Sequence, residues 1–193
     1  MLNVSAYKFV RLDGLPERKT ELKSLADSLA LKGTILLSPE GINIFLSGMP
    51  EQVHCFFNRL RQDPLLSDVE PKESLSPSQP FRRMLVRLKK EIIAFGISEI
   101  QPDRSTSPKL KARVLKQWLD EGREVVLLDT RNDYEIDLGT FRNAQHLNIH
   151  HFRDFSTAID RLPEQFKDKT IVMFCTGGIR CEKAGPLMQQ AGF

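Results

Sequence analysis

The sequence predicts two domains within its 193 residues, an α+β domain followed by an α/β domain. Three observations predict this. The first half orders its strands and helices as βαββαβ, and the second half alternates helices with short, continuously apolar strands. Between them, Gln101–Pro108 is bounded by prolines and lacks periodic apolar residues, as is typical of a linker. We therefore expect domains at residues 1–97 and 113–193, joined by a linker at 98–112.

The first domain is predicted from apolar spacing of two kinds. Residues 17–31 carry leucine and alanine at the i, i+3, i+4, i+7 positions of one helical face, whereas 34–37 and 42–46 are apolar strands flanking the turn-rich Ser38–Gly41. In order, we expect a strand at 4–10, a helix at 17–31, antiparallel strands at 34–37 and 42–46, a helix at 49–60 and a strand at 83–94. This order matches the ferredoxin-like, or acylphosphatase-like, arrangement of one sheet backed by two helices.

The second domain is predicted to contain a parallel sheet. We expect a helix at 114–121, a strand at 125–128, a helix at 156–166, a strand at 170–174 and a helix at 179–190. Strands that are apolar throughout are typical of a parallel sheet covered on both faces. Gly192 resembles a helix C-cap, which normally leads into another element. We therefore expect this domain to be truncated and the natural protein to be longer.

Composition favours a soluble protein of the cytoplasm. Of the residues, 40% are hydrophobic, but no apolar run approaches the roughly 20 residues that span a bilayer. The first residues, Met1–Lys8, show neither the basic region nor the cleavage site of a signal peptide. The three cysteines are too few for a disulfide scaffold, which indicates a reducing compartment. In such a compartment a free thiol could carry the function.

Cys175 is the strongest candidate for a reactive residue. It ends the predicted strand at 170–174, and Thr176, Gly177 and Gly178 lead directly into a helix at Ile179. Two glycines let the backbone curl with its N–H groups inward, and a helix N-terminus adds partial positive charge. These groups and Arg180 should lower the pKa of Cys175 and make it a nucleophile. A merely buried cysteine at a strand end would leave the adjacent glycines and arginine unexplained.

The Cys175–Arg180 loop, together with upstream Leu128-Asp-Thr-Arg131, Glu135 and Gly139, resembles the rhodanese family. The resemblance implies that Cys175 accepts sulfur as a persulfide, that residues 176–180 form an anion-binding loop, and that Asp129, Arg131 and Glu135 support the loop. Arg131 could pair bidentately with either Glu135 or Asp129, and such pairs usually fix geometry. We interpret all three as structural.

A longer set of motifs resembles the tRNA uridine 5-hydroxylase family. It comprises Cys175–Ala184, Glu40-Gly-Ile-Asn43 and Phe81–Ile93, and it covers nearly the whole chain. The resemblance implies hydroxylation of uridine 34 in the tRNA anticodon loop to 5-hydroxyuridine, with molecular oxygen as co-substrate and the rhodanese cysteine retained. The family pattern ordinarily has Gly-His where this chain has Gly139-Thr140, so no histidine acts there. The sequence contains no recognisable cofactor motif.

Two other functions remain open from the sequence. The protein could be a sulfurtransferase that donates sulfur from a Cys175 persulfide, or a non-catalytic RNA-binding module with a vestigial rhodanese domain. The intact cysteine loop argues against the second alternative, and the added N-terminal domain argues that a sulfurtransferase acting on small molecules is incomplete. The loop alone does not separate hydroxylation from sulfur transfer, and the sequence does not indicate an oligomeric state.

The remaining cysteines and the histidines give weaker signals. Cys181 lies six positions after Cys175 and is either a packed helix-face thiol or a resolving thiol that forms a disulfide with oxidised Cys175. Cys55 lies on an apolar helix and is expected in the core. His146, His150 and His151 lack an accompanying carboxylate or cysteine at ligand spacing, so we expect no metal site.

Basic residues are concentrated from the last predicted strand of the first domain to the first predicted helix of the second. Residues 81–116 contain ten Lys or Arg and three Asp or Glu, although the formal net charge of the chain is only +3. A solvated surface is the simplest interpretation. The family resemblance favours RNA contact instead, because phosphate contacts supply most nonspecific affinity. The candidate RNA-binding residues are Arg82, Arg83, Arg87, Lys89 and Lys90.

Overall fold

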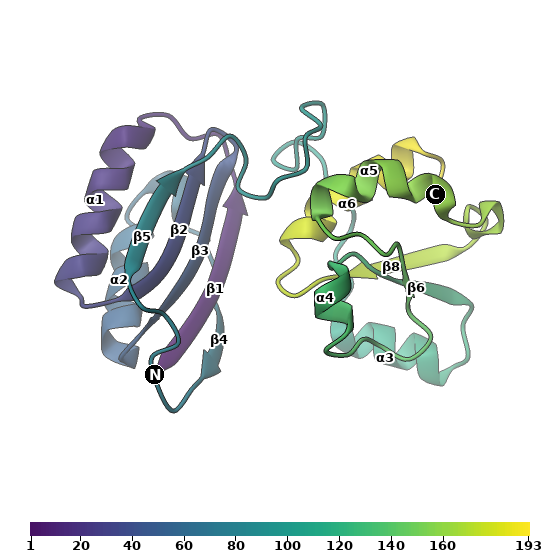
Figure 1. Ribbon diagram of the computed structural model, residues 1–193, viewed down its shortest axis with the longest axis horizontal. Coiled ribbons are helices and arrows are strands. Elements are labelled where there is room, and N and C mark those ends of the chain that lie inside the picture. Colours follow the sequence, from purple (N-terminus) through teal and green to yellow (C-terminus); the bar gives the residue numbers. More distant parts are fainter. The chain divides into compact units, whose positions relative to one another are not determined.

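The computed structural model describes residues 1–193 and divides them into two compact units, Met1–Ile93 and Ala94–Phe193. The N-terminal unit contains a five-stranded sheet and the C-terminal unit a three-stranded one. Figure 1 shows helices packed beside the sheet of each unit. The two predicted fold classes are confirmed. No helix in residues 1–193 combines the length and the apolar character needed to cross a membrane.

The N-terminal unit is a sheet in the order β4-β1-β3-β2-β5. Its elements are β1 (Leu2–Phe9), α1 (Leu15–Ser28), β2 (Lys32–Ser38), β3 (Gly41–Gly48), α2 (Pro50–Leu60), a 3-10 turn (Pro64–Leu66), β4 (Lys72–Leu75) and β5 (Met84–Leu88). As predicted, β2 and β3 pair antiparallel, with Ser38 opposite Gly41 at the hairpin. Helices α1 and α2 cover one face of the sheet (Figure 1).

The assignment of the fourth strand was wrong. The strand that completes the βαββαβ order is β4, which pairs antiparallel with β1, and the predicted strand at 83–94 is a fifth, β5, which pairs parallel with β2 at the opposite edge. All four residues of β4 are exposed, so the sequence lacks the alternation that marks a half-buried strand. The predicted strand also ended too late, because β5 stops at Leu88.

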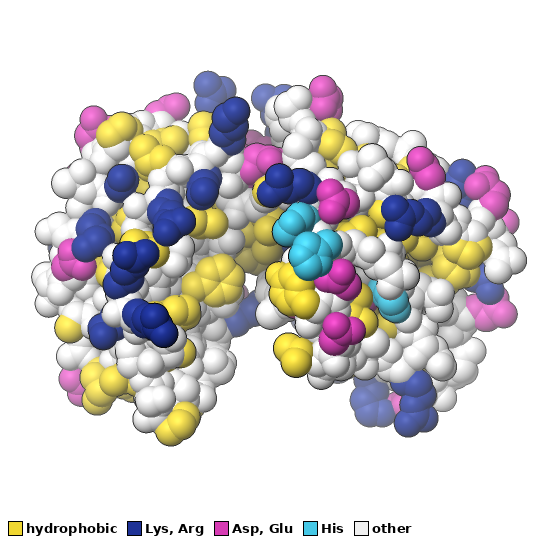
Figure 2. Space-filling view, in the orientation of Figure 1, with side chains coloured by type: hydrophobic (Ala, Val, Ile, Leu, Met, Phe, Trp, Pro, Cys, Tyr) yellow, Lys and Arg dark blue, Asp and Glu magenta, His cyan; other side chains and the backbone are white.

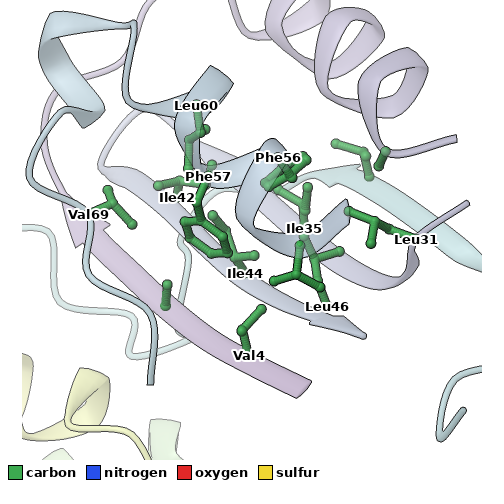
Figure 3. Close-up of a cluster of buried hydrophobic side chains, with 14 of the residues drawn as sticks. Val4, Leu31, Ile35, Ile42, Ile44, Leu46, Phe56, Phe57, Leu60 and Val69 are labelled. Atoms are coloured by element: carbon green, nitrogen blue, oxygen red, sulfur yellow. The ribbon is translucent and has the colours of Figure 1, made fainter. Parts of the chain in front are cut away.

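The core of the N-terminal unit lies between the sheet and the two helices. Figure 3 shows Ile35, Ile42 and Ile44 of the strands packed against Phe56 and Phe57 of α2. Alternate residues of β1, β2 and β3 point into this core, so their intervening residues occupy the opposite face.

The prediction that Cys55 belongs to this core was wrong, because its side chain is exposed. The buried residues of α2 are Val53, Phe56, Phe57 and Leu60, which recur at the spacing of one helical face. Cys55 falls between them in sequence and therefore points away from the sheet. Even a helix rich in apolar residues has one face toward solvent, and the position of Cys55 along the helix places it on that face.

The C-terminal unit contains a three-stranded parallel sheet in the order β7-β6-β8. Its elements are α3 (Ala112–Asp120), β6 (Val125–Asp129), α4 (Asp133–Ile136), β7 (Gln145–His146), 3-10 turns at Phe152–Asp154, Ile159–Arg161 and Glu164–Phe166, α5 (Phe155–Ala158), β8 (Thr170–Phe174) and α6 (Ile179–Gln190). The parallel pairing of β6 with β8 confirms the predicted sheet, and it brings Asp129 opposite Phe174. Strand β6 is largely buried and β8 is half-buried.

The predicted helix at 156–166 is absent as a single element. Short helical pieces occupy 152–161, Leu162 is extended, and another turn follows Pro163. Proline disfavours helical geometry in the residue before it, so the helix cannot continue through Leu162. Three apolar residues of the predicted helix, Ala158, Ile159 and Leu162, are nevertheless buried.

The segment expected as a linker contacts helix α6. The Thr106 hydroxyl donates to a Glu182 carboxylate oxygen at 2.7 Å. A Cβ atom on Gly185 would lie 2.0 Å from the Ser107 hydroxyl oxygen, so the segment approaches the helix where glycine leaves room. Residues near 106 therefore help to fix the helix that follows the Cys175 loop.

Candidate active site

Cys175 lies in the turn that joins β8 to α6, at the carboxyl end of a parallel strand. Gly178, the residue before the helix, has φ 96°, a conformation that glycine adopts with little strain. This geometry turns the backbone N–H of Gly178 toward Cys175, 3.0 Å from its Sγ atom. The predicted strand, loop and helix junction is therefore present, with the sulfur at its centre.

The loop surrounds the Cys175 sulfur with hydrogen-bond donors. The Cys181 thiol and the backbone N–H groups of Arg180 and Gly177 donate to it, and the Arg180 guanidinium adds positive charge. Together these groups outweigh the opposing effect of burial and hold the pKa of Cys175 well below its usual value. The same contacts raise the pKa of Cys181, because its proton is shared with the neighbouring thiolate. Cys175 is thus the anion of the pair.

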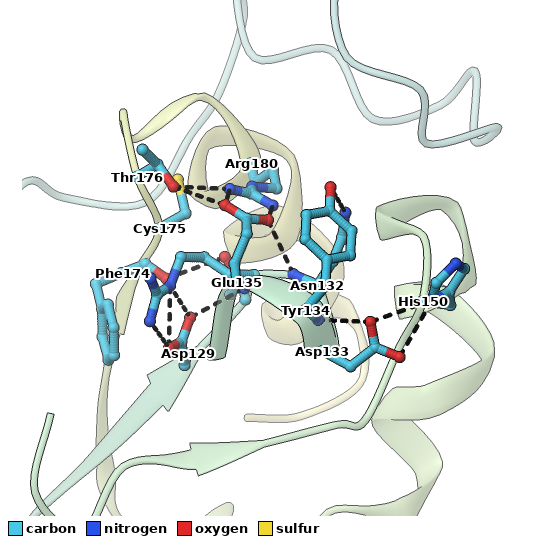
Figure 4. Close-up of polar contacts among 12 residues, drawn as sticks. Asp129, Asn132, Asp133, Tyr134, Glu135, His150, Phe174, Cys175, Thr176 and Arg180 are labelled. Carbon is cyan, nitrogen blue, oxygen red and sulfur yellow. Dashed lines mark hydrogen bonds and ion pairs between the residues drawn. The ribbon is translucent and has the colours of Figure 1, made fainter. Parts of the chain in front are cut away.

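Arg180 is held in place by Glu135. Its Nη1 and Nη2 atoms donate to the two Glu135 carboxylate oxygens at 2.5 and 2.7 Å, and Nη2 lies 3.1 Å from the Thr176 hydroxyl. The Thr176 hydroxyl donates in turn to Glu135 at 2.8 Å (Figure 4). Hydrogen bonds from Arg180, with smaller contributions from Thr176 and the Asn132 backbone, lower the pKa of Glu135 to about 2 despite partial burial. Glu135 therefore connects α4 to both ends of the loop.

The structure resolves the partner of Arg131. Its Nε and Nη2 atoms donate to the two carboxylate oxygens of buried Asp129 at 2.9 and 2.7 Å, while Glu135 binds Arg180 instead. Nη2 also donates to the Gly139 carbonyl, and the Thr140 hydroxyl donates to Asp129 at 2.7 Å. Burial raises the pKa of Asp129, but Arg131 and Thr140 together lower it below its usual value.

Two threonines support the site without having been predicted. Thr140, where the family resemblance implied a histidine, contacts Asp129 through its hydroxyl. Thr130 donates from its backbone N–H to the Phe174 carbonyl at 3.0 Å, and its hydroxyl lies 3.6 Å from the Cys181 sulfur. Thr130 follows Asp129 at the carboxyl end of β6, and polar residues at that edge of a parallel sheet lie near the next strand's end. The contact of Thr130 with the site could have been predicted from this position at the end of a strand.

The histidines have a carboxylate neighbour that sequence spacing did not show. His150 Nδ1 lies 3.1 Å from an Asp133 oxygen, and the Tyr134 ring meets His150 edge to face (Figure 4). His150 and His151 have ring centroids 4.8 Å apart, and His146 lies on β7. No group of three or more His, Cys, Asp or Glu side chains in residues 1–193 is arranged to hold a metal ion.

The pH dependence of alkylation tests the thiolate. In the folded protein, iodoacetamide labelling of Cys175 should reach half its plateau rate at a pH below the roughly 8.5 of a free cysteine, because the anion is the stabilised form. Exposed Cys55, which lies outside this loop, is the internal control. Peptide mass spectrometry would measure both residues in one sample. Equal midpoints for the two cysteines would contradict the assignment of the anion to Cys175.

Comparison with known proteins agrees with this geometry. Residues 1–92 match a family described as a UPF0176 acylphosphatase-like domain, and residues 111–193 match the rhodanese-like domain. A Variovorax paradoxus protein named tRNA uridine(34) hydroxylase is 50% identical over 197 residues, covering all of this chain and 75% of the relative. Proteins of the same name from Cupriavidus pinatubonensis and Thiobacillus denitrificans are 49% and 47% identical, again over the whole chain, which covers 70% and 79% of them. The chain therefore belongs to the tRNA uridine(34) hydroxylase family.

Proposed function

We propose that this protein hydroxylates C5 of uridine 34 in tRNA, with Cys175 as its reactive group. The observation that carries the proposal is a cysteine thiolate held by backbone N–H groups and by Arg180, in a chain whose full length matches proteins named for this reaction. The reaction would take place in the cytoplasm, on the anticodon loop, where uridine 34 is unpaired and its base can be presented to a protein.

A thiolate at this position can add to an electrophilic carbon of the substrate. In uracil that carbon is C6, and bond formation there places electron density on C5, the atom that becomes oxygenated. Arg180 and the loop N–H groups hold the sulfur anionic before attack, and Glu135 fixes Arg180. We propose molecular oxygen as the oxidant: one oxygen atom becomes the 5-hydroxyl group, and the other leaves as water with two electrons and two protons from a thiol reductant, which becomes a disulfide. Loss of the C5 proton then expels the Cys175 thiolate from C6 and restores the C5–C6 double bond. The loop thus supplies the nucleophile.

Nucleoside mass spectrometry of tRNA tests this function. Cells lacking the protein should lose 5-hydroxyuridine from tRNA, and the wild-type gene should restore it. Growth under ¹⁸O₂ should place the heavy isotope in the nucleoside. A thiouridine has the same nominal mass as 5-hydroxyuridine, so exact mass and retention time must distinguish them. Loss of a thiolated nucleoside instead would establish the sulfurtransferase alternative, and an unchanged nucleoside profile would leave only RNA binding.

Cys181 has a structural role as a donor to the Cys175 thiolate. We propose that it also resolves oxidised Cys175. A Cys175 sulfenic acid and the Cys181 thiol would form a disulfide and release water, so that sulfur oxidation does not proceed to irreversible products. Once Cys175 is oxidised its negative charge is gone, and the charge that raises the pKa of Cys181 is removed with it.

We also propose that the basic residues around β5 contact tRNA phosphates. Arg82, Arg83, Arg87, Lys89 and Lys90 are all exposed, and Met84 and Val86 between them are buried, so Arg83, Arg87 and Lys89 alternate with the core positions. Figure 2 shows Lys and Arg side chains gathered on the N-terminal unit. Such a surface supplies the electrostatic part of RNA affinity.

Reversing Arg83, Arg87 and Lys89 to Glu should weaken tRNA binding and flatten its salt dependence. Each phosphate contact to single-stranded RNA contributes about 0.7 to the slope of log K against log salt, so losing three should lower the slope by about 2. A salt titration of tRNA binding measures this. Reversal of Lys19, Lys23 and Arg59, which lie on the helices of the same unit, is the matched control. If the salt titrations of the two triple variants superimposed, the β5 residues would be solvated charges that do not contact tRNA.

A further inference from the structure

The sheet face opposite helices α1 and α2 has an exposed aromatic side chain at its centre. Phe45 lies on β3, the middle strand of the sheet, and is 39% exposed. Its direct cross-strand neighbours on this face are Ser5 of β1 and Thr34 of β2. Both are small, so they do not cover the Phe45 ring. Elsewhere on β3 every residue is buried.

The ends of this face are covered by chain segments, which leaves Phe45 between them. At one end the Asn43 side chain donates to the Ile92 carbonyl at 3.1 Å. At the other end the Gln79 side chain donates to the Ser47 carbonyl at 3.0 Å. The same two segments bury Asn43 and Ser47, which flank Phe45 at the alternate positions of β3. Phe45 is therefore the exposed residue of β3, between two residues of the same face that are buried.

Charge on the face around Phe45 is positive. In register, Thr34 of β2 lies beside Leu85 of β5, and Leu36 lies beside Arg87. Lys32 lies opposite Ser47 and Lys72 opposite Ser5, so basic residues flank the ring on both sides. The strand positions on this face include no Asp or Glu. Arg87 lies two strands from Phe45 and two residues along β5 from Leu85, which is in line with Phe45, so the two Cα atoms are roughly 12 Å apart.

We propose that this face binds single-stranded RNA, with one unpaired base stacked on the Phe45 ring and the adjoining phosphates on Arg87 and Lys32. A flat aromatic ring with open access stacks any base, and flanking cations bind the backbone on either side. Four-stranded sheets that present aromatic side chains bind single-stranded RNA in this way in other proteins. The choice of RNA as occupant rests on the proposed function and on the charge of the face.

Phe45→Ala is the central variant of the test. Binding of the full chain to a labelled anticodon stem-loop RNA should weaken roughly 5- to 150-fold, because one stacked base is lost. Binding to a blunt RNA duplex with the same number of phosphates should stay unchanged, since a duplex offers no unstacked base. Phe45→Trp should keep wild-type affinity for the stem-loop. The salt slope should be the same in Phe45→Ala and wild type, because no phosphate contact is removed.

Leu65→Ala is the matched control, since Leu65 is 40% exposed and lies on the 3-10 turn after α2. It should bind both RNAs as wild type does. Unchanged stem-loop affinity in Phe45→Ala would overturn the inference and indicate that the face serves a protein partner or nothing. An equal loss on stem-loop and duplex would also overturn it. If tRNA nucleosides show no hydroxylation while Phe45 still governs stem-loop binding, the proposed function fails and this inference stands.

Discussion

Replacing Cys175 by Ser is expected to lower formation of 5-hydroxyuridine at least about a thousandfold, the scale seen when a catalytic nucleophile is removed. A serine hydroxyl stays protonated in the same cradle, so the Gly178 N–H and the Arg180 charge face a neutral group. The measurement is the 5-hydroxyuridine content of tRNA in cells that express the variant in place of wild type, at matched protein levels.

The control for this variant is Cys55→Ser, which changes the same atom at an exposed position of the other unit and should leave hydroxylation intact. Thermal unfolding should show that Cys175→Ser folds like wild type, because a half-buried loop thiol contributes little packing. Stem-loop binding should also persist, since Cys175 lies outside the face around Phe45. Wild-type levels of 5-hydroxyuridine in a folded Cys175→Ser protein would show that the thiolate is not catalytic.

The Cys175 loop could be predicted from sequence because its parts are contiguous. Strand, cysteine, two glycines and helix follow one another within ten residues, so local rules fix the loop and the direction of its N–H groups. Cys181 lies close to Cys175 for the same reason, since it is in the first turn of the helix that the loop enters. The sequence does not show which of the two sulfurs carries the negative charge. That depends on which sulfur accepts the hydrogen bonds, and only the three-dimensional contacts show this.

The partner of Arg180 could not be predicted in the same way. Glu135 is 45 positions away, and its approach depends on β6 and β8 being adjacent strands of one sheet. Sequence left Arg131 with two possible carboxylates, and it did not offer Arg180 as the partner of either. The parallel pairing of β6 with β8 brings Arg180 to Glu135, which lies one helical turn beyond Arg131. Asp129, at the end of β6, is then the carboxylate that binds Arg131.

The errors in the fold share one physical cause, which is that exposed or broken elements lack periodicity. Strand β4 has no buried residue, so nothing in Lys72–Leu75 alternates. The region 152–166 is apolar enough to suggest a helix, yet Pro163 divides it into short pieces. Phe45 was not singled out either, because an apolar residue in an apolar strand resembles core until the register shows which face it occupies.

Replacing Arg180 by Met is expected to destabilise the protein by about 3 kcal/mol, the lower end of the range for breaking a buried ion pair. Arg180 is 8% exposed and makes two hydrogen bonds to Glu135 and one to Thr176. Methionine fills much of the volume, so the main loss is the charge that balances Glu135 and the Cys175 thiolate. Lys116→Met, which breaks an exposed pair with Asp120, is the matched control and should cost less than about 0.5 kcal/mol.

The pH dependence of this destabilisation identifies its origin. The pKa of Glu135 is lowered to about 2 in the folded protein from an ordinary 4.5, so its ionisation stabilises the fold above pH 4.5, and this contribution is lost as the pH falls toward 2. In Arg180→Met that pKa should rise, so the stability difference between wild type and variant should be largest near neutral pH and shrink on acidification. Adding Glu135→Gln to Arg180→Met should recover part of the loss, because no unpaired carboxylate remains. Urea unfolding of the four proteins between pH 3 and 7 measures both effects. A difference that stays constant with pH would assign the loss to packing around the methionine and not to the ion pair.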